Sequence, residues 1–157
     1  MIPKFISKTE EQIVLFDMDG VLAELIVGEE KDIIANKYGV YRYKRPMMTI
    51  VNTAKQLSEM ENISVGILSS CCHTEQIAEK KDWLKQYMPF IEDKNIEIIV
   101  WNDGKYTLAT RKFAKLDSIK RMNAPCKVFL IEDTYENIYA INDEIPNCAH
   151  HVSELVD

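Results

Sequence analysis

Two short, almost unbroken apolar runs constrain the fold of this chain more than any other feature. They cover residues 13–16 and 128–131, and an acidic residue follows each of them directly. Two further runs, residues 63–68 and 96–101, end in Ser-Ser and in Asn-Asp-Gly. Short apolar runs with polar or turn-forming ends are typical of strands that a parallel sheet buries on both faces. The sequence therefore predicts four such strands, and a weaker pattern predicts a fifth over residues 149–152.

Helical patterns fill the intervals between the predicted strands. Pro46 suits the first turn of a helix, and Thr74 and Thr134 suit the position just before one. Apolar residues at helical spacing follow each of them, and another such stripe covers residues 113–122. Strands that alternate with helices predict a three-layer, Rossmann-like α/β domain with a central parallel sheet.

The length of the chain suits one domain, so we expect residues 1–157 to form a single unit. The segment 24–45 is longer than an ordinary connection between a strand and a helix. Because it follows the first predicted strand, we expect it to form a small cap insertion over the functional site.

The composition narrows the class of partners. Lys and Arg number 19 and Asp and Glu number 25, which gives a net charge of −6. An acidic surface disfavours polymeric nucleic acid and anionic membranes as partners, and we expect neither. The sequence has no signal-peptide pattern and no apolar stretch of the ~20 residues that cross a membrane. We therefore expect a cytoplasmic protein whose four cysteines are reduced.

Polar side chains occur where the predicted strands end. Asp17 and Asp19 follow the first strand, Ser69 follows the second, and Glu132 and Asp133 follow the fourth. In an open parallel sheet, ligands bind beyond the carboxyl ends of the strands. A cluster of acids at that edge repels itself unless a cation lies among them. Mg²⁺ is the natural candidate because it takes hard oxygen ligands and keeps exchangeable waters.

The first acidic segment has a chemical logic of its own. Asp17 can bind the metal and attack phosphorus, which divides hydrolysis into formation and breakdown of an acyl phosphate. Asp19, two residues later, can protonate the leaving oxygen and then deprotonate water. Gly20 allows a sharp turn where a side chain would obstruct the pocket.

These residues carry a family resemblance. The string Asp-Met-Asp-Gly-Val at 17–21 resembles the first signature of the haloacid dehalogenase (HAD) superfamily of phosphohydrolases. Ser69, after Gly-Ile-Leu, is similar to the second signature, a strand-terminal hydroxyl that hydrogen-bonds the transferring phosphoryl group. The segment 131–138 resembles the fourth signature, an acidic pair followed by Asp or Asn.

The resemblance implies a site and an activity. It implies a Mg²⁺-dependent phosphatase that forms an aspartyl phosphate on Asp17. Asp133 would be the second carboxylate on Mg²⁺, and Asp19 would add its backbone carbonyl. Ser69 and its neighbour Ser70 would bind the phosphoryl group.

Two features of the resemblance leave alternatives open. The third signature of the superfamily is a Lys that neutralises phosphate and nucleophile, and Lys115 matches its placement best. Lys112 and Lys105 are the other candidates. Glu132 stands where many relatives have Asp or Gly, so the resemblance does not decide whether it contacts the metal.

A finer resemblance points to the 5'(3')-deoxyribonucleotidase-like group. It rests on Asp-Met-Asp-Gly-Val-Leu-Ala at 17–23 and on the Glu-Lys-x-x-Trp-Leu pattern at 79–84. It implies a (deoxy)nucleoside monophosphate as a candidate among small phosphorylated metabolites. The cap region of this chain is shorter than that of the group.

Aromatic and basic residues alternate within the expected cap. We expect Arg42 and Tyr43 to contact the substrate, with a cation steering phosphate and a ring stacking on a base. The alternative is a solvated surface segment.

The neighbours Cys71, Cys72 and His73 suggest a zinc site. The absence of a second ligand pair at the usual spacing disfavours zinc.

Three functions compete at this point. The first is a phosphatase acting on a small monoester. The second is a non-catalytic HAD-like module that binds a phosphorylated ligand or partner. The third is a phospho-receiver domain, which explains neither Asp19-Gly20 nor the insertion at 24–45. An acid two residues from a nucleophile favours the enzyme.

Overall fold

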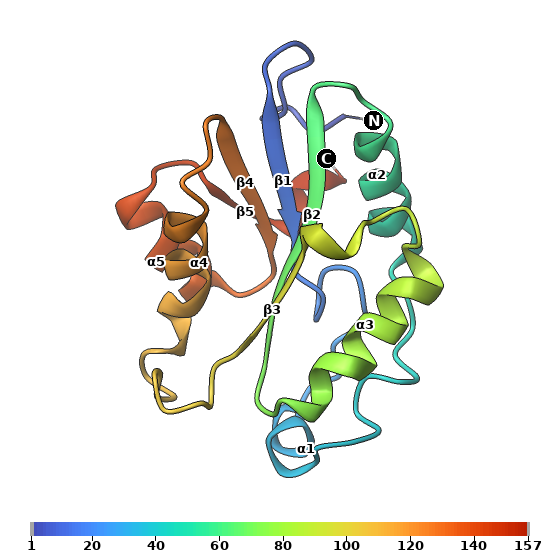
Figure 1. Cartoon of the computed structure of the whole chain (residues 1–157), viewed down its shortest axis with the longest axis vertical. Coiled ribbons are helices and arrows are strands. Elements are labelled where there is room, and N and C mark those ends of the chain that lie inside the picture. Colours follow the sequence, from blue (N-terminus) through green and yellow to red (C-terminus); the bar gives the residue numbers. More distant parts are fainter. Residues whose placement is uncertain (1, 157) are drawn as a thin grey trace.

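A five-stranded parallel sheet forms the centre of the protein. The computed structural model describes residues 2–156, and its sheet has the strand order β3-β2-β1-β4-β5 (Figure 1). The strands are β1 (Gln12–Phe16), β2 (Ile63–Cys71), β3 (Ile96–Val100), β4 (Lys127–Glu132) and β5 (Ala149–His151). Each strand is parallel to its neighbours. All five predicted strands are therefore confirmed.

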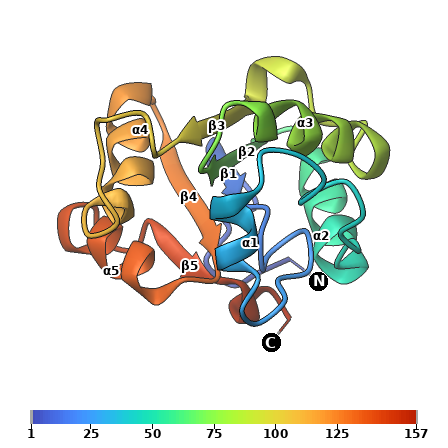
Figure 2. The ribbon, with the colours of Figure 1, turned by 90° about the horizontal axis from the view of Figure 1, so that it is seen from below.

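Helices surround this sheet, and α2 to α5 cover its two faces. They are α1 (Glu30–Ala35), α2 (Met48–Ser58), α3 (Glu75–Tyr87), α4 (Ala114–Met122) and α5 (Tyr135–Glu144). Short 3-10 turns occur at η1 (Asp93–Asn95), η2 (Arg111–Phe113) and η3 (Val152–Leu155). Helices α2 and α3 lie on one side of the sheet and α4 and α5 on the other, as seen in Figures 1 and 2. The predicted three-layer α/β architecture is confirmed.

The apolar runs form strands because both faces of the sheet are covered. Val14 and Phe16 of β1 belong to the cluster that packs under α2 and α3. Leu15, between them, belongs to the cluster under α4 and α5. Successive side chains of a strand point to opposite faces, so a strand buried on both sides needs apolar residues at every position.

The structure corrects one strand boundary that matters for the site. Strand β2 continues three residues beyond the predicted end, through Cys71. Its last residues pair with β3, with Ser69 opposite Ile98 and Cys71 opposite Val100. Ser69 therefore lies inside the strand and not at its end, because the neighbouring strand extends the ladder past it.

The segment 24–45, called the insertion below, contains a small helix that lies beyond the carboxyl ends of the strands (Figure 2). Helix α1 has six residues and none of them is buried. It is tied to the beginning of α3 by side chains that reach its backbone. The Gln76 amide donates to the carbonyls of Ile33 and Asn36 at 2.7 and 2.9 Å, and the His73 ring lies 2.6 Å from the carbonyl of Ile34.

None of the helices within residues 2–156 combines the length and apolarity that crossing a bilayer demands. All four cysteines are free.

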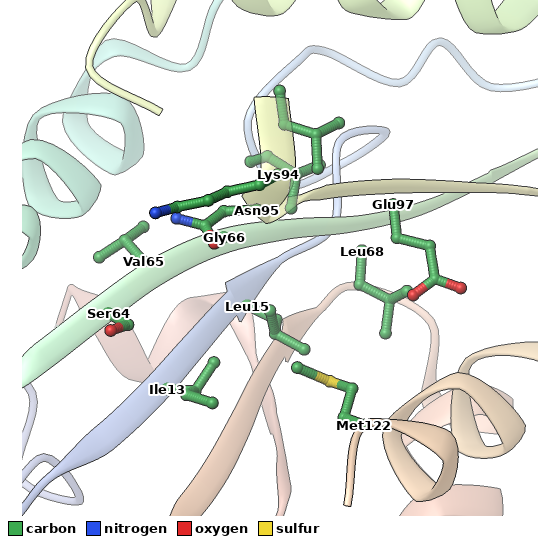
Figure 3. Close-up of a pocket in the computed structure, with 12 residues that line it drawn as sticks. Ile13, Leu15, Ser64, Val65, Gly66, Leu68, Lys94, Asn95, Glu97 and Met122 are labelled. Carbon is green, nitrogen blue, oxygen red and sulfur yellow. The ribbon is translucent and has the colours of Figure 1, made fainter. Parts of the chain in front are cut away.

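A cavity of about 310 Å³ lies on the α4 face of the sheet. Figure 3 shows Ile13 and Leu15 of β1, Leu68 of β2 and Met122 of α4 around it. Its charged lining residues, Lys94 and Glu97, do not form a cluster of acids or nucleophiles. This cavity is a gap in the cover of the sheet, away from the polar strand ends.

Gly66 gives a test of how tightly this region packs. A Cβ added there would lie 2.8 Å from the carbonyl oxygen of Asn95 and 3.0 Å from Leu15 Cδ2. We expect Gly66→Ala to lower the free energy of unfolding by about 1–3 kcal/mol, measured by urea denaturation. Ser64→Ala, at an exposed position of the same strand, should change it by less than about 0.5 kcal/mol. Equal stability of the two variants would contradict the close approach of η1 to β2.

Candidate active site

A cleft of about 290 Å³ opens at the carboxyl edge of the sheet. It is lined by acids from the ends of β1 and β4, by the end of β2, and by residues of the insertion and of the η2–α4 region. These include Asp17, Asp19, Tyr41, Ser70, Cys71, Trp101, Arg111, Lys112, Lys115, Asp133 and Asn137. Strands β1 and β4 are neighbours in the sheet, so residues far apart in sequence meet at this edge.

Asp17 lies at the floor of the cleft. Its backbone N–H donates to the carbonyl of Ile131 at 3.0 Å, which fixes the residue beside β4. The residue is 6% exposed. Burial raises the pKa of Asp17 to about 6, although the nearby ammonium of Lys115 opposes this shift. A carboxylate that is desolvated and close to a cation is suited to attack phosphorus when ionised.

Lys115 joins the acids of the two strand ends. Its ammonium lies 2.9 Å from Asp17 Oδ2 and 2.5 Å from Glu132 Oε2. Burial alone would lower the pKa of Lys115, but the carboxylates of Asp17 and Glu132 raise it, so the group is charged. Of the three candidate lysines, Lys115 contacts the predicted nucleophile, Lys112 lines the cleft, and Lys105 lies outside the lining.

Glu132 is saturated by hydrogen bonds. Its Oε1 accepts from the backbone N–H groups of Asp133 and Thr134 at 3.0 and 3.1 Å. Its Oε2 accepts from Lys115 at 2.5 Å and from Asn137 at 3.2 Å. With four donors on a fully buried carboxylate, Glu132 has no lone pair directed at a metal. Its contacts orient Lys115 and the turn that carries Asp133.

Asp133 lies against the turn that follows β1. Gly20 has φ +78°, and a Cβ there would lie 2.1 Å from Asp133 Oδ2. The absence of a side chain at Gly20 thus lets the two strand ends approach each other. Thr134 Oγ1 donates to Asp133 Oδ1 at 3.2 Å. Burial raises the pKa of Asp133 as well.

The acids fit a divalent cation. One carboxylate oxygen each from Asp17, Glu132 and Asp133 lie within 4.8 Å of one another. Since Glu132 is occupied by its four donors, Asp17 and Asp133 are the carboxylates that remain to hold a metal. Two carboxylates beside an open cleft suit Mg²⁺, which takes few protein ligands and keeps several waters.

Asp19 lies in a different electrostatic environment from Asp17. Its two carboxylate oxygens accept from Lys44 at 2.9 Å and from Lys80 at 2.8 Å. Burial alone would raise the pKa of Asp19, but the two ammonium groups outweigh it and lower the pKa. Its carboxylate is thereby held by the two lysines, in the lining of the same cleft as Asp17 and Asp133.

Sequence reasoning missed both of these lysines as site residues. Lys80 has no exposed surface, and its ammonium also donates to Ser69 Oγ and to the carbonyl of Ser70, both at 2.8 Å. Lys44 also pairs with Glu29 at 2.9 Å. The Glu-Lys-x-x-Trp-Leu pattern contains Lys80, and its placement one turn before Trp83 was the available signal.

The structure distinguishes the two serines of β2. Ser69 is fully buried, and its hydroxyl accepts from Lys80. Ser70 lines the cleft. Adjacent residues of a strand point to opposite sides, so both cannot face one substrate with their side chains. Ser70 is the hydroxyl that the structure brings to the acids.

The insertion contributes Tyr41 to the cleft in place of the residues expected from sequence. Arg42 and Tyr43 are exposed, Tyr43 at 81%, and neither lines the cleft. Tyr41 is 2% exposed, and its ring centroid lies 4.4 Å from Lys80 Nζ and 5.2 Å from Lys44 Nζ. The two lysines that hold Asp19 thus also hold this ring.

Cys71 and Cys72 do not form a metal site with His73. Cys71 donates its thiol to the carbonyl of His73 at 3.3 Å. Burial raises the pKa of Cys71 to about 11, so it stays a thiol and not a metal-binding thiolate. Within residues 2–156, the acids Asp17, Glu132 and Asp133 are the group spaced to hold a metal.

Comparison with solved structures identifies the fold. Chains from "the Pnkp1/Rnl/Hen1 RNA repair complex" and "Pnkp1/Rnl/Hen1 complex" match with TM-scores of 0.67 and 0.61 at 14% and 13% identity. They cover 95% and 92% of this chain, which spans 44% and 47% of theirs. The HAD domain of the effector protein Lem4 from Legionella pneumophila matches with a TM-score of 0.51 at 15% identity, covering 92% of this chain and 86% of that domain. The chain has a HAD-like fold.

The similarity to these three structures is one of fold. No family model and no curated protein matches the sequence at a significant level. The finer resemblance to 5'(3')-deoxyribonucleotidases has no counterpart among these three structures, and it stays a prediction.

Gly20 tests the geometry of the acidic cluster. We expect Gly20→Ala to abolish detectable metal binding, because its Cβ would displace the Asp133 carboxylate and its φ of +78° strains any L side chain. The measurement is the shift in Tm with added Mg²⁺. Gly104→Ala is a matched control, because it also has positive φ but no atom lies within 4 Å of its Cβ position. Normal Mg²⁺ binding by Gly20→Ala would contradict the packing of Asp133 on this turn.

The pH dependence of metal binding follows from the raised pKa values of the acids. Protons compete with the metal at Asp17, whose carboxyl ionises near pH 6. We expect the affinity for Mg²⁺ to fall about tenfold between pH 7 and pH 5, measured by titration calorimetry. An affinity that is constant over this range would remove Asp17 as a ligand.

The affinity for Mg²⁺ should rise with pH, whereas the contribution of Asp17 to the stability of the metal-free protein should fall. The carboxyl of Asp17 ionises near 3.8 when unfolded and near 6 when folded, so the folded state binds more protons in that window. Its contribution therefore makes the free energy of unfolding decrease as pH rises from about 4 to 6.

Proposed function

We propose that this protein is a Mg²⁺-dependent phosphatase that hydrolyses a small phosphate monoester through an aspartyl phosphate on Asp17. One observation carries the proposal. A buried carboxylate at the end of β1 lies beside a charged lysine and within metal-sharing distance of Asp133, at the floor of an open cleft. The HAD-like fold supports it, because polar strand ends are where ligands bind in an open parallel sheet.

The chemistry assigns a role to each residue. An oxygen of Asp17 attacks phosphorus, the bond from phosphorus to the substrate oxygen breaks, and the alcohol leaves. Water then cleaves the acyl phosphate, which releases inorganic phosphate and regenerates Asp17. Asp19, ionised beside Lys44 and Lys80, is suited to take the proton of the attacking water, while the leaving oxygen takes its proton from solvent. Lys115 stabilises the negative charge that spreads over the phosphoryl oxygens.

The metal would be held by Asp17 and Asp133, and when bound it neutralises the charge of the phosphate and of the nucleophile. The remaining roles belong to the β2 end. Ser70 is placed to donate its hydroxyl to a phosphoryl oxygen, while Lys80 holds Ser69, the carbonyl of Ser70 and Asp19 in one arrangement.

The proposed substrate is a small phosphorylated metabolite. The cleft of about 290 Å³ accommodates a compact molecule, and the rings of Tyr41 and Trp101 line it. A (deoxy)nucleoside monophosphate is one candidate, because planar bases stack on aromatic side chains. The non-catalytic alternative, a module that only binds a phosphorylated ligand, gives no reason for a second acid held by two buried lysines.

The nucleophile can be tested directly. We expect Asp17→Asn to lower Mg²⁺-dependent release of phosphate from phenyl phosphate by at least about a thousandfold, because the amide cannot form the acyl phosphate. Asp143→Asn, an exposed acid on α5, should retain activity. Full activity in Asp17→Asn would remove Asp17 as the nucleophile. Circular dichroism would show whether the variant is folded.

A further inference from the structure

Arg111 and Trp101 form one wall of the cleft, outside the acidic floor. Trp101 follows β3 and is 8% exposed, and its backbone N–H donates to the carbonyl of Cys71 at 3.0 Å. The guanidinium carbon of Arg111 lies 5.1 Å from the centroid of the Trp101 ring. Both residues line the same cleft as Asp17. A guanidinium held over an indole face keeps its N–H groups free for an anion.

The cations of this wall differ from those of the floor. Lys115 pairs with the buried carboxylates of Asp17 and Glu132. Lys44 and Lys80, both buried, pair with Asp19, which is half-buried. Among residues 2–156, Arg111 pairs only with Glu30 of α1, and the two side chains are 36% and 59% exposed. Exposed ion pairs contribute about 0–1 kcal/mol, so an incoming anion can replace Glu30 at little cost.

A second cation stands beside Arg111. Lys112 is the next residue of η2, and it also lines the cleft. Within residues 2–156 no carboxylate lies within ion-pair distance of its ammonium. The wall therefore presents one weakly neutralised cation and one without a carboxylate partner, facing the same space as the acids that would act on phosphate.

We propose, on the basis of the phosphatase function above, that Arg111 determines specificity by binding a second anionic group on the alcohol part of the substrate. The substrate class is then a small phosphate monoester that also carries a carboxylate or a further phosphate. The cleft of about 290 Å³ brings both anions into one enclosure. The transferring phosphate lies on the floor, the second anion replaces Glu30 on Arg111, and the aliphatic or aromatic part of the substrate packs against Tyr41 and Trp101.

Glu30 gives this proposal an effect of opposite sign. As the internal anion on Arg111, it competes with the substrate's own second anion. Removal of its charge should therefore strengthen recognition of that anion, whereas removal of Arg111 should weaken it. A merely structural role of the Glu30–Arg111 pair would make both substitutions act in the same direction.

The experiment compares phenyl phosphate with 3- and 4-carboxyphenyl phosphate. The readout is the ratio of kcat/KM for the better carboxylated substrate to that for phenyl phosphate, in wild type and variants, which cancels intrinsic reactivity. We expect Arg111→Ala and Arg111→Gln to lower this ratio roughly tenfold or more, mainly through KM, since a charge-assisted hydrogen bond is lost. Glu30→Gln should raise it. Arg121→Ala, which removes an exposed arginine paired with Glu97 on α4, should leave it unchanged.

A binding measurement separates this inference from the proposed function. Phenylphosphonate and its carboxylated analogues, titrated with Mg²⁺ present, should give the same ratios in Kd. If the wild type does not turn over any of these substrates but its ratio of Kd values still depends on Arg111, the phosphatase function is overturned. Recognition of the second anion by Arg111 would then still stand. Turnover or binding with a ratio that Arg111→Ala and Arg111→Gln do not change would overturn the role of Arg111.

Discussion

The ammonium group of Lys115 lies between two carboxylates in a part of the protein that excludes water, and the site depends on this contact. Asp17, Lys115 and Glu132 come from the end of β1, the first turn of α4 and the end of β4. Transfer of these charges from water is costly, and their mutual attraction offsets it only where further hydrogen bonds complete each group. Glu132 meets that condition with three donors besides Lys115.

A second charged cluster gives Asp17 and Asp19 different properties. Asp17 is desolvated near one shared lysine and has a raised pKa, whereas Asp19 accepts from two lysines of its own and has a lowered one. Divergent environments are how neighbouring carboxyl groups acquire different roles. Lys44 and Lys80 also connect the insertion to α3, and the Trp83 indole donates to the carbonyl of Lys44 at 2.9 Å. The position of the Asp19 carboxylate thus depends on how the insertion packs against α3.

The sequence predicted the parts of this site that follow from the backbone of a parallel sheet. Apolar runs identified the strands, and their ends brought residues 17, 19 and 133 to one edge, because parallel strands share that edge. Side-chain direction was harder to predict. Ser69 is buried and lies outside the cleft lining, because pairing with β3 extends β2 past it.

The remaining misses concern residues whose position depends on long-range packing. Tyr41, Arg42 and Tyr43 lie in an irregular segment, so the sequence does not indicate which of them points inward. Contacts with Lys80 and Lys44 place Tyr41 in the cleft. Lys44 and Lys80 look like ordinary surface lysines in sequence, since Lys is rarely buried. Nothing local indicates that Arg111 meets Trp101, at the other end of the β3–α4 connection, and Glu30, in the insertion.

The sparse attachment of α1 has a consequence for how this fold can diversify. The helix buries none of its residues. It joins the rest of the domain through backbone carbonyls that Gln76 and His73 contact and through the exposed ion pair of Glu30 with Arg111. Carbonyls are present whatever the side chains are, and an exposed ion pair contributes only about 0–1 kcal/mol, so these anchors place little demand on the local sequence. Changes of residue or length in this helix would remodel the entrance while the acids beneath it stay in place. New substrate ranges could therefore evolve here at little thermodynamic risk to the domain.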